Sequence, residues 1–170
     1  MGASPLPASD KTDFLASIFD ALPIPALVVD WDVRIFEFNL AAARMLEKMP
    51  SAILHPRAGE ALHCIHSTET PKGCGHSGAC HDCVIRNSVN EVFGGGKPGR
   101  KLAHMSLIRD NQPADTDLLV TVASVPDEDE PLALLILDSV SELSALLNPA
   151  SSFPDSRVPA KAPVHRKGNS

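Results

Sequence analysis

The hydrophobic and polar positions of the chain repeat with two different periods. An apolar residue every three or four positions predicts a helix, whereas strict alternation or a short apolar run predicts a strand. In chain order, the pattern predicts a helix, a β-hairpin, a second helix, an irregular segment with a third helix, three more strands and a final helix. The predicted elements cover residues 9–22, 26–30 with 33–39, 40–49, 80–93, 100–110, 117–125, 132–138 and 140–147.

In the first two predicted helices, the apolar residues recur at helical spacing and so fall on one face. In the first, Phe14, Ile18 and Leu22 lie four residues apart, and Pro23 ends the helix. The residues predicted to point inward from the second are Leu40, Ala43, Leu46 and Met49.

The last three strands are joined by polar links that contain proline. The links over 111–116 and 126–131 have the composition of antiparallel hairpin loops. Together these elements predict an α+β domain, in which helices cover one face of a five-stranded antiparallel sheet. Further helices are expected to flank the sheet at both ends of the domain.

The length of the chain suits one domain with flanking segments. We expect residues 10–148 to form that domain, with an irregular insert at 59–83, and residues 1–9 to be a disordered N-terminus. Residues 149–170 are rich in proline and carry four basic residues against one acidic residue, which predicts a disordered basic tail. The start lacks the features of a secretory signal, and no apolar run is long enough for a bilayer, so we expect a cytoplasmic protein without a membrane segment.

The charge of the chain argues against a nucleic-acid partner. The formal net charge is −6, made up of −9 over residues 1–150 and +3 from Ser151 onward. Proteins that bind phosphate backbones need a basic surface. An acidic body of this kind does not supply one.

One short stretch, HCIHSTETPKGCGHSGACHDC from His63 to Cys83, holds all four cysteines and four of the seven histidines. In a reducing compartment, clustered cysteines favour metal ligation or redox chemistry over structural disulfides. The cysteines follow the spacing C-x9-C-x5-C-x2-C and are Cys64, Cys74, Cys80 and Cys83.

The positions of these cysteines suit ligands. Cys80 and Cys83 are predicted to share the first turn of the helix over 80–93, where both thiolates lie on one side and the helix N-terminus favours their charge. Cys74 stands in the segment GCG, whose glycines allow a sharp backbone and amide groups that donate to cluster sulfurs. Structural zinc usually has two short Cys knuckles, whereas one C-x2-C with two solitary cysteines is more typical of an iron–sulfur cluster. Zinc and metal-free thiol chemistry stay open as alternatives.

The histidines of the stretch are expected to surround the cofactor, because four cysteines already complete a ligand set. There they would tune the cofactor and couple pH to it. A mixed Cys/His site remains an alternative. The four histidines are His63, His66, His76 and His81, whereas His55 and His104, outside the stretch, are expected to be structural.

The segment IFDALPIPALVVDWDVRIFEFNLAAARML at 18–46 and the strand LLILDSVSE at 134–142 resemble the PAS domain, a sensory module of bacterial signalling proteins. The resemblance covers about Asp13 to Leu147 and implies a non-enzymatic sensor. GEALHC at 59–64 and GCGHSGACHDC at 73–83 further resemble a subset of PAS domains with a Cys-rich insert of the form GEALxC…GCG…CxxC. This subset implies a cysteine-ligated cofactor that reports redox state, oxygen or nitric oxide.

We therefore expect a stand-alone PAS sensor that holds a 4Fe–4S or 2Fe–2S iron–sulfur cluster through the four cysteines. The resemblance implies a homodimer that signals to a separate partner such as a histidine kinase. The alternatives are a PAS interaction module with a structural four-cysteine zinc site, a metal-free thiol switch, and haem at His81, since some PAS domains bind haem through a helix histidine. Thiol–disulfide exchange at Cys80 and Cys83 is not expected, because the βαβ context of thioredoxin-like enzymes is missing.

Overall fold

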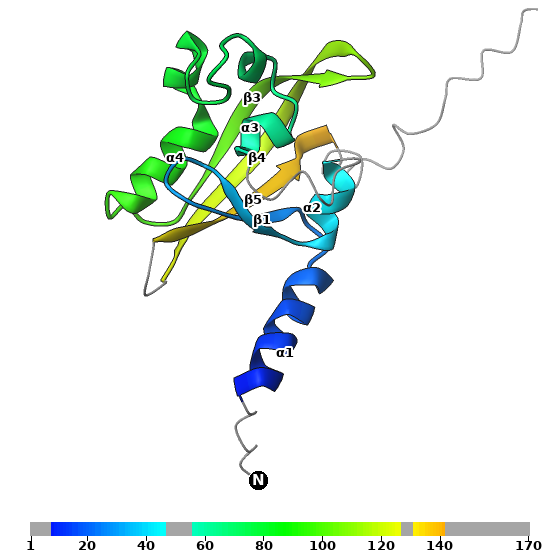
Figure 1. Cartoon of the computed structure of the whole chain (residues 1–170), viewed down its shortest axis with the longest axis vertical. Helices are drawn as coiled ribbons and strands as arrows, with labels where there is room; N and C mark the ends of the chain where they lie inside the picture. Colours follow the sequence, from blue (N-terminus) through cyan, green and yellow to red (C-terminus); the bar gives the residue numbers. More distant parts are fainter. Residues whose placement is uncertain (1–7, 47–55, 127–130, 142–170) are drawn as a thin grey trace, which may run out of the picture.

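The computed structural model describes residues 8–46, 56–126 and 131–141. Its five strands form one antiparallel sheet in the order β2-β1-β5-β4-β3, which confirms the predicted α+β architecture (Figure 1). The strands are β1 (Ala26–Val29), β2 (Ile35–Phe38), β3 (Gly99–Arg109), β4 (Gln112–Val125) and β5 (Leu132–Ser139). The helices are α1 (Ala8–Ala21), α2 (Leu40–Met45), α3 (Ala58–Ala61) and α4 (Val84–Phe93), with short 3-10 helices η1 (Ile65–Thr68) and η2 (Gly78–Asp82).

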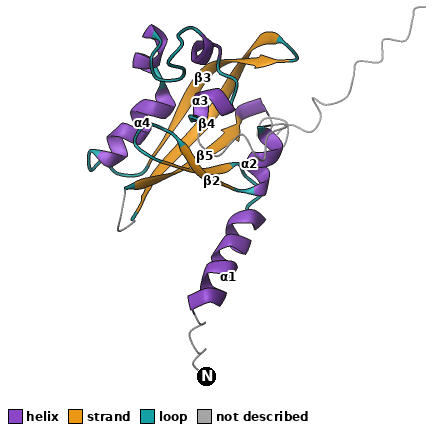
Figure 2. Cartoon of the chain, in the orientation of Figure 1, coloured by secondary structure: helices purple, strands orange, loops and turns teal. Residues whose placement is uncertain are grey.

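The core lies between one face of the sheet and the helices that cover it (Figure 2). Side chains alternate between the two faces of a strand, so every second residue of β4 and β5 points into this core. Leu118, Val120 and Val122 of β4 are at most 1% exposed, as are Leu135 and Leu137 of β5. The residues that α4 buries against them are Ile85, Ser88, Val89 and Val92.

A buried asparagine joins the first helix to the sheet. Asn39 is 0% exposed, and its Oδ1 accepts hydrogen bonds from the backbone N–H groups of Ala26 at 3.0 Å and Ala42 at 2.8 Å. Asn39 therefore caps α2 and fixes the start of β1 at once. Its Nδ2 donates to the carbonyl oxygens of Phe19, Leu22 and Ile24.

The connection between β3 and β4 is shorter than predicted. The sequence suggested a loop over 111–116, but β4 begins at Gln112, which pairs with Arg109. Only Asp110 and Asn111 form the turn, with φ values of 47° and 65°. Asp and Asn tolerate this left-handed conformation, and a two-residue turn with two positive φ values matches the twist of a hairpin.

The inward face predicted for α2 is only partly correct. Leu46 is 3% exposed, but Leu40 is 52% exposed, and Ala42 is the buried residue of the first turn. The cap formed by Asn39 sets the rotation of the helix and turns Leu40 to solvent. In α1, which projects away from the sheet in Figure 1, Phe14 and Ile18 are 53% and 46% exposed.

Several predicted features lie outside the described residues. They are Met49, His55, the middle of the link over 126–131, the helix over 140–147 beyond Ser141, the segment over 1–7 and the tail over 149–170.

None of the helices in the described ranges combines the length and the apolar character that a membrane crossing needs.

We predict that Asn39→Ala lowers the free energy of unfolding by about 3 kcal/mol, because it removes a helix cap and leaves buried backbone groups unpaired. Urea unfolding followed by circular dichroism measures this change. Asn90→Ala is the matched control, since Asn90 is exposed on α4 and its loss should change stability by less than about 0.5 kcal/mol. Equal effects of the two substitutions would contradict the role of Asn39.

Candidate functional site

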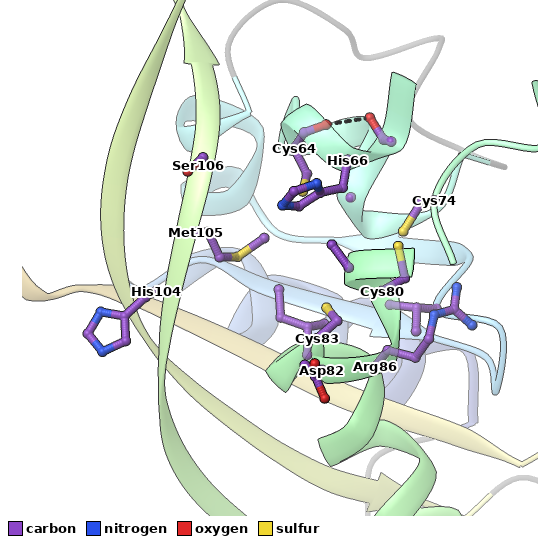
Figure 3. Close-up of a pocket in the computed structure, with 15 residues that line it drawn as sticks. Cys64, His66, Cys74, Cys80, Asp82, Cys83, Arg86, His104, Met105 and Ser106 are labelled. Atoms are coloured by element: carbon purple, nitrogen blue, oxygen red, sulfur yellow. Dashed lines mark hydrogen bonds between the residues drawn. The ribbon is translucent and has the colours of Figure 1, made fainter. Parts of the chain in front are cut away.

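The four cysteines line one cavity of about 260 Å³ between the sheet and the helices (Figure 3). They come from four places along the chain: Cys64 precedes η1, Cys74 lies in the following loop, Cys80 is in η2 and Cys83 precedes α4. All four are free thiols of intermediate burial. The sequence prediction that these residues act together is therefore compatible with their placement.

Cys64 is fixed against the sheet by the backbone on either side of it. Its own N–H donates to the carbonyl oxygen of Gly59 at 2.8 Å, which closes the end of α3. The carbonyl oxygen of His63 accepts from the N–H of Ile108 at 2.8 Å, and Cys64 forms a bridge with Leu107 of β3. The start of the insert is thus tied to β3.

Glycines shape the loop around Cys74. Gly73 and Gly75 have φ values of 79° and 92°, a region that L-residues with side chains rarely adopt. The N–H of Gly75 donates to the Sγ of Cys80 at 3.3 Å. This contact is of the kind that the GCG segment predicts, although the sulfur that receives it belongs to Cys80 rather than to Cys74 itself.

A third glycine makes room for Cys74. A Cβ atom at the buried Gly59 would lie 2.6 Å from the Sγ of Cys74 and 3.7 Å from the Cβ of Cys64. No real Cβ atom approaches sulfur that closely, so position 59 requires glycine for Cys74 to keep its place. The glycine of the GEALHC segment is therefore part of the site.

The predicted placement of Cys80 and Cys83 on one helical turn is wrong. Cys80 lies in η2, and Cys83 has an extended backbone at φ −65° and ψ 115° as the N-cap of α4. The N–H of Cys83 donates to the carbonyl oxygen of Cys80 at 3.3 Å, which closes a 3-10 turn before α4 begins. Both side chains nevertheless line the cavity.

Burial controls the charge of two of the thiols. Desolvation raises the pKa of Cys64 above 9.0, and the nearby Cys83 and Cys80 add to this effect. Desolvation also raises the pKa of Cys74 above 9.0, although a hydrogen bond from Arg86 acts in the opposite direction. At neutral pH these two thiols are protonated until a positive charge, such as a metal, enters the site.

An ionic network that the sequence analysis did not identify adjoins the cysteines. The carboxylate of Asp32, in the turn between β1 and β2, accepts from Arg57 Nε at 2.8 Å and from Arg86 Nη1 at 3.1 Å. Arg86 Nη2 also donates to the backbone carbonyl of Asp32 at 3.3 Å. Burial opposes the charge of Arg86, yet hydrogen bonds to Asp32 and Cys74 raise its pKa overall. The only sequence signal for this network was an acidic residue in the predicted hairpin turn.

Among the described histidines, His66 and His104 line the cavity, and the others lie around it. His66 lines the cavity, and its Nδ1 is 2.6 Å from Glu69 Oε1. His63, His76 and His81 are exposed. His104 pairs with Asp117 on β4, and Figure 3 shows its ring directed away from the cavity.

The donor set suits a group larger than one ion. In the part of the chain that the structure describes, no three His, Cys, Asp or Glu side chains are placed to hold one metal ion. A zinc ion needs its sulfur ligands about 2.3 Å from one point. The cysteines instead surround a cavity of about 260 Å³, which lies below the roughly 300–1,000 Å³ of pockets for organic ligands. The cavity is larger than one ion requires and smaller than a typical organic ligand requires, so its size suits a compact inorganic group with thiolate ligands.

Comparisons with known proteins give matches to solved structures alone, since no family model and no curated protein matches the chain. The PAS domain of BvgS from Bordetella pertussis matches with a TM-score of 0.53 at 15% identity, covering 85% of this chain and 99% of that one. The PAS domain of nitrogen regulation protein NR(II) from Vibrio parahaemolyticus matches with a TM-score of 0.53 at 13% identity, covering 74% and 97%. A PAS domain from a two-component sensor histidine kinase matches with a TM-score of 0.54 at 9% identity, covering 78% and 99%.

This chain has the fold of a PAS domain. Within this fold, the cavity that the four cysteines line is bordered by β3 and by the segments from η1 to α4.

The Asp32 network predicts how the stability of the chain depends on pH. Burial opposes ionisation of Asp32, but hydrogen bonds and charges from Arg86 and Arg57 lower the pKa of its carboxyl group below 3.8. The ionised group therefore stabilises the fold above about pH 4, and this contribution is lost as the pH falls through the lowered pKa. We predict that Asp32→Asn costs about 1–3 kcal/mol at pH 7 and much less at pH 3.

Urea unfolding of the metal-free protein at both pH values measures these differences. Asp20→Asn is the control, because Asp20 is exposed on α1. A cost of Asp32→Asn that is independent of pH would contradict the prediction.

Proposed function

We propose that this PAS domain is a sensor that binds an iron–sulfur cluster through Cys64, Cys74, Cys80 and Cys83. The observation that carries the proposal is that thiols from four separate segments line one cavity. Cysteine thiolates are the usual ligands of such clusters, and backbone N–H groups commonly donate to their sulfurs. The hydrogen bond from Gly75 N–H to Cys80 Sγ supports this assignment.

The same geometry favours a cluster over zinc. A structural zinc site closes around one ion about 2.3 Å from each sulfur, whereas these cysteines line a cavity of about 260 Å³. The other option, a metal-free thiol switch, needs a thiolate at neutral pH. Burial instead raises the pKa of both Cys64 and Cys74, which argues against these two thiols as free nucleophiles.

Two observations support the signalling part of the proposal: the fold of the domain and the exposed apolar side chains of α1. Solved PAS domains with this fold come from a sensor histidine kinase and a nitrogen regulation protein. We infer that this domain acts without catalysis in the cytoplasm and passes redox state, oxygen or nitric oxide to a separate partner such as a histidine kinase. Phe14, Leu15 and Ile18 are 53%, 55% and 46% exposed on α1, which supports pairing with a second copy.

When bound, the cluster supplies a centre that gains or loses one electron, and its charge acts on the segments that carry its ligands. Three of these segments, η1, η2 and the start of α4, are short and lie at the edge of the cavity. α4 packs against β3, β4 and β5, so a displacement at Cys83 is passed to the sheet.

Purification of the full chain without oxygen tests the proposal. We predict brown protein with visible charge-transfer absorption and with iron and acid-labile sulfide in equal amounts. Serine at any one of the four cysteine positions should abolish or strongly reduce the iron content, whereas His81→Ala should leave it unchanged, because His81 is exposed. A colourless protein with one zinc per chain would falsify the proposal, and so would one without any metal.

A glycine pair gives a sharper test of the site. We predict that Gly59→Ala lowers the iron content at least several-fold, because its Cβ would displace the Sγ of Cys74. Gly78→Ala is the matched control, since a Cβ there meets nothing within 4 Å. Iron analysis and circular dichroism of both variants separate loss of the site from loss of the fold. Full loading of Gly59→Ala would contradict the placement of Cys74 beside Gly59.

A further inference from the structure

Arg86 is the side chain that joins the cysteine site to the Asp32 network. Its side chain is 16% exposed and extends from α4 along the cavity (Figure 3). One side of the guanidinium binds the Asp32 carboxylate at 3.1 Å, and Arg86 lines the same cavity as Cys74, whose sulfur helps to raise the pKa of the guanidinium. A half-buried cation is thus held between a carboxylate and a sulfur.

The loop leaves just enough space for this cation. A Cβ atom at Gly75 would lie 2.2 Å from Arg86 Nη2, so the guanidinium rests directly on the backbone next to Cys74. The N–H of the same Gly75 donates to Cys80 Sγ, so this loop also supplies a backbone donor to one of the sulfurs. Arginine fits such a place because its planar fork can bind two partners at once while keeping its charge.

We propose that Arg86 is a positioning residue that sets the reduction potential of the site, with Asp32 holding it in place and moderating its charge. This inference rests on the proposed cluster. One-electron reduction by a low-potential donor adds one negative charge to the site and breaks no bond. A cation beside a ligand sulfur stabilises the more negative state and raises the potential, and a neighbouring carboxylate lowers it.

The test is a pair of substitutions with opposite expected signs. Redox titration of the anaerobically purified full chain with dithionite measures the midpoint potential from the visible spectrum. Arg86→Gln should lower the ratio of reduced to oxidised protein at fixed potential about tenfold, equivalent to about 59 mV for one electron. Asp32→Asn should raise this ratio, because an asparagine oxygen still accepts from Arg86 but carries no charge.

Two further variants separate electrostatics from packing. Arg57→Gln is the matched control: Arg57 binds the same carboxylate at 2.8 Å and has a similar exposed fraction, 15%, but it is not among the residues that line the cysteine cavity. It should keep the ratio within about threefold. Arg86→Lys keeps the charge and should restore most of the potential lost in Arg86→Gln.

The outcomes distinguish this inference from the proposed function. Wild-type protein without iron and sulfide overturns both. If the wild type holds a cluster, but Arg86→Gln and Asp32→Asn shift its midpoint potential in the same direction or leave it unchanged, the role of Arg86 alone is overturned. If Arg86→Gln cannot hold the cluster, two measurements still decide whether Arg86 sets the potential. They are the sign of the potential shift in Asp32→Asn and the midpoint potential of Arg86→Lys.

Discussion

The carboxylate of Asp32 is the point on which the arrangement around the cavity depends. Two arginines, 15% and 16% exposed, converge on it from the segment before α3 and from α4. Half-buried guanidinium groups need an anionic partner, because removal from water without one is costly. Asp32 supplies this partner from the turn between β1 and β2 and so ties three distant parts of the chain together. The Asp30 carboxylate shapes that turn by accepting from the N–H groups of Asp32 and Arg34.

The cysteine site depends on a second constraint, which is close approach of backbone to side chain. Gly59 leaves room for the sulfur of Cys74, and Gly75 leaves room for the guanidinium of Arg86. Both contacts would be impossible with a Cβ atom present. Glycines in this insert therefore do more than permit turns, since they let sulfur atoms and a cation share a small space with main chain.

Much of the fold could be predicted from the sequence, because it follows from local periodicity. The strand predicted over 117–125 is rich in apolar residues, and burial alternates along it so that Leu118, Val120 and Val122 point into the core. The sequence predictions were wrong where tertiary contacts or turn geometry determine the local structure. Asn39 turns Leu40 away from the core, and the Asp110–Asn111 turn extends β4 into residues that have the composition of a loop.

The sequence by itself determined that all four cysteines belong to one short stretch, most of it irregular. Only the tertiary structure decided how they are placed: Cys80 lies in η2, Cys83 is the N-cap of α4, and Cys64 is held by β3. It alone revealed Asp32, Arg57 and Arg86 as neighbours of the site. Charged residues 25 and 54 positions apart leave no periodic signal in a sequence, because only the packing of the elements that carry them brings their charges together.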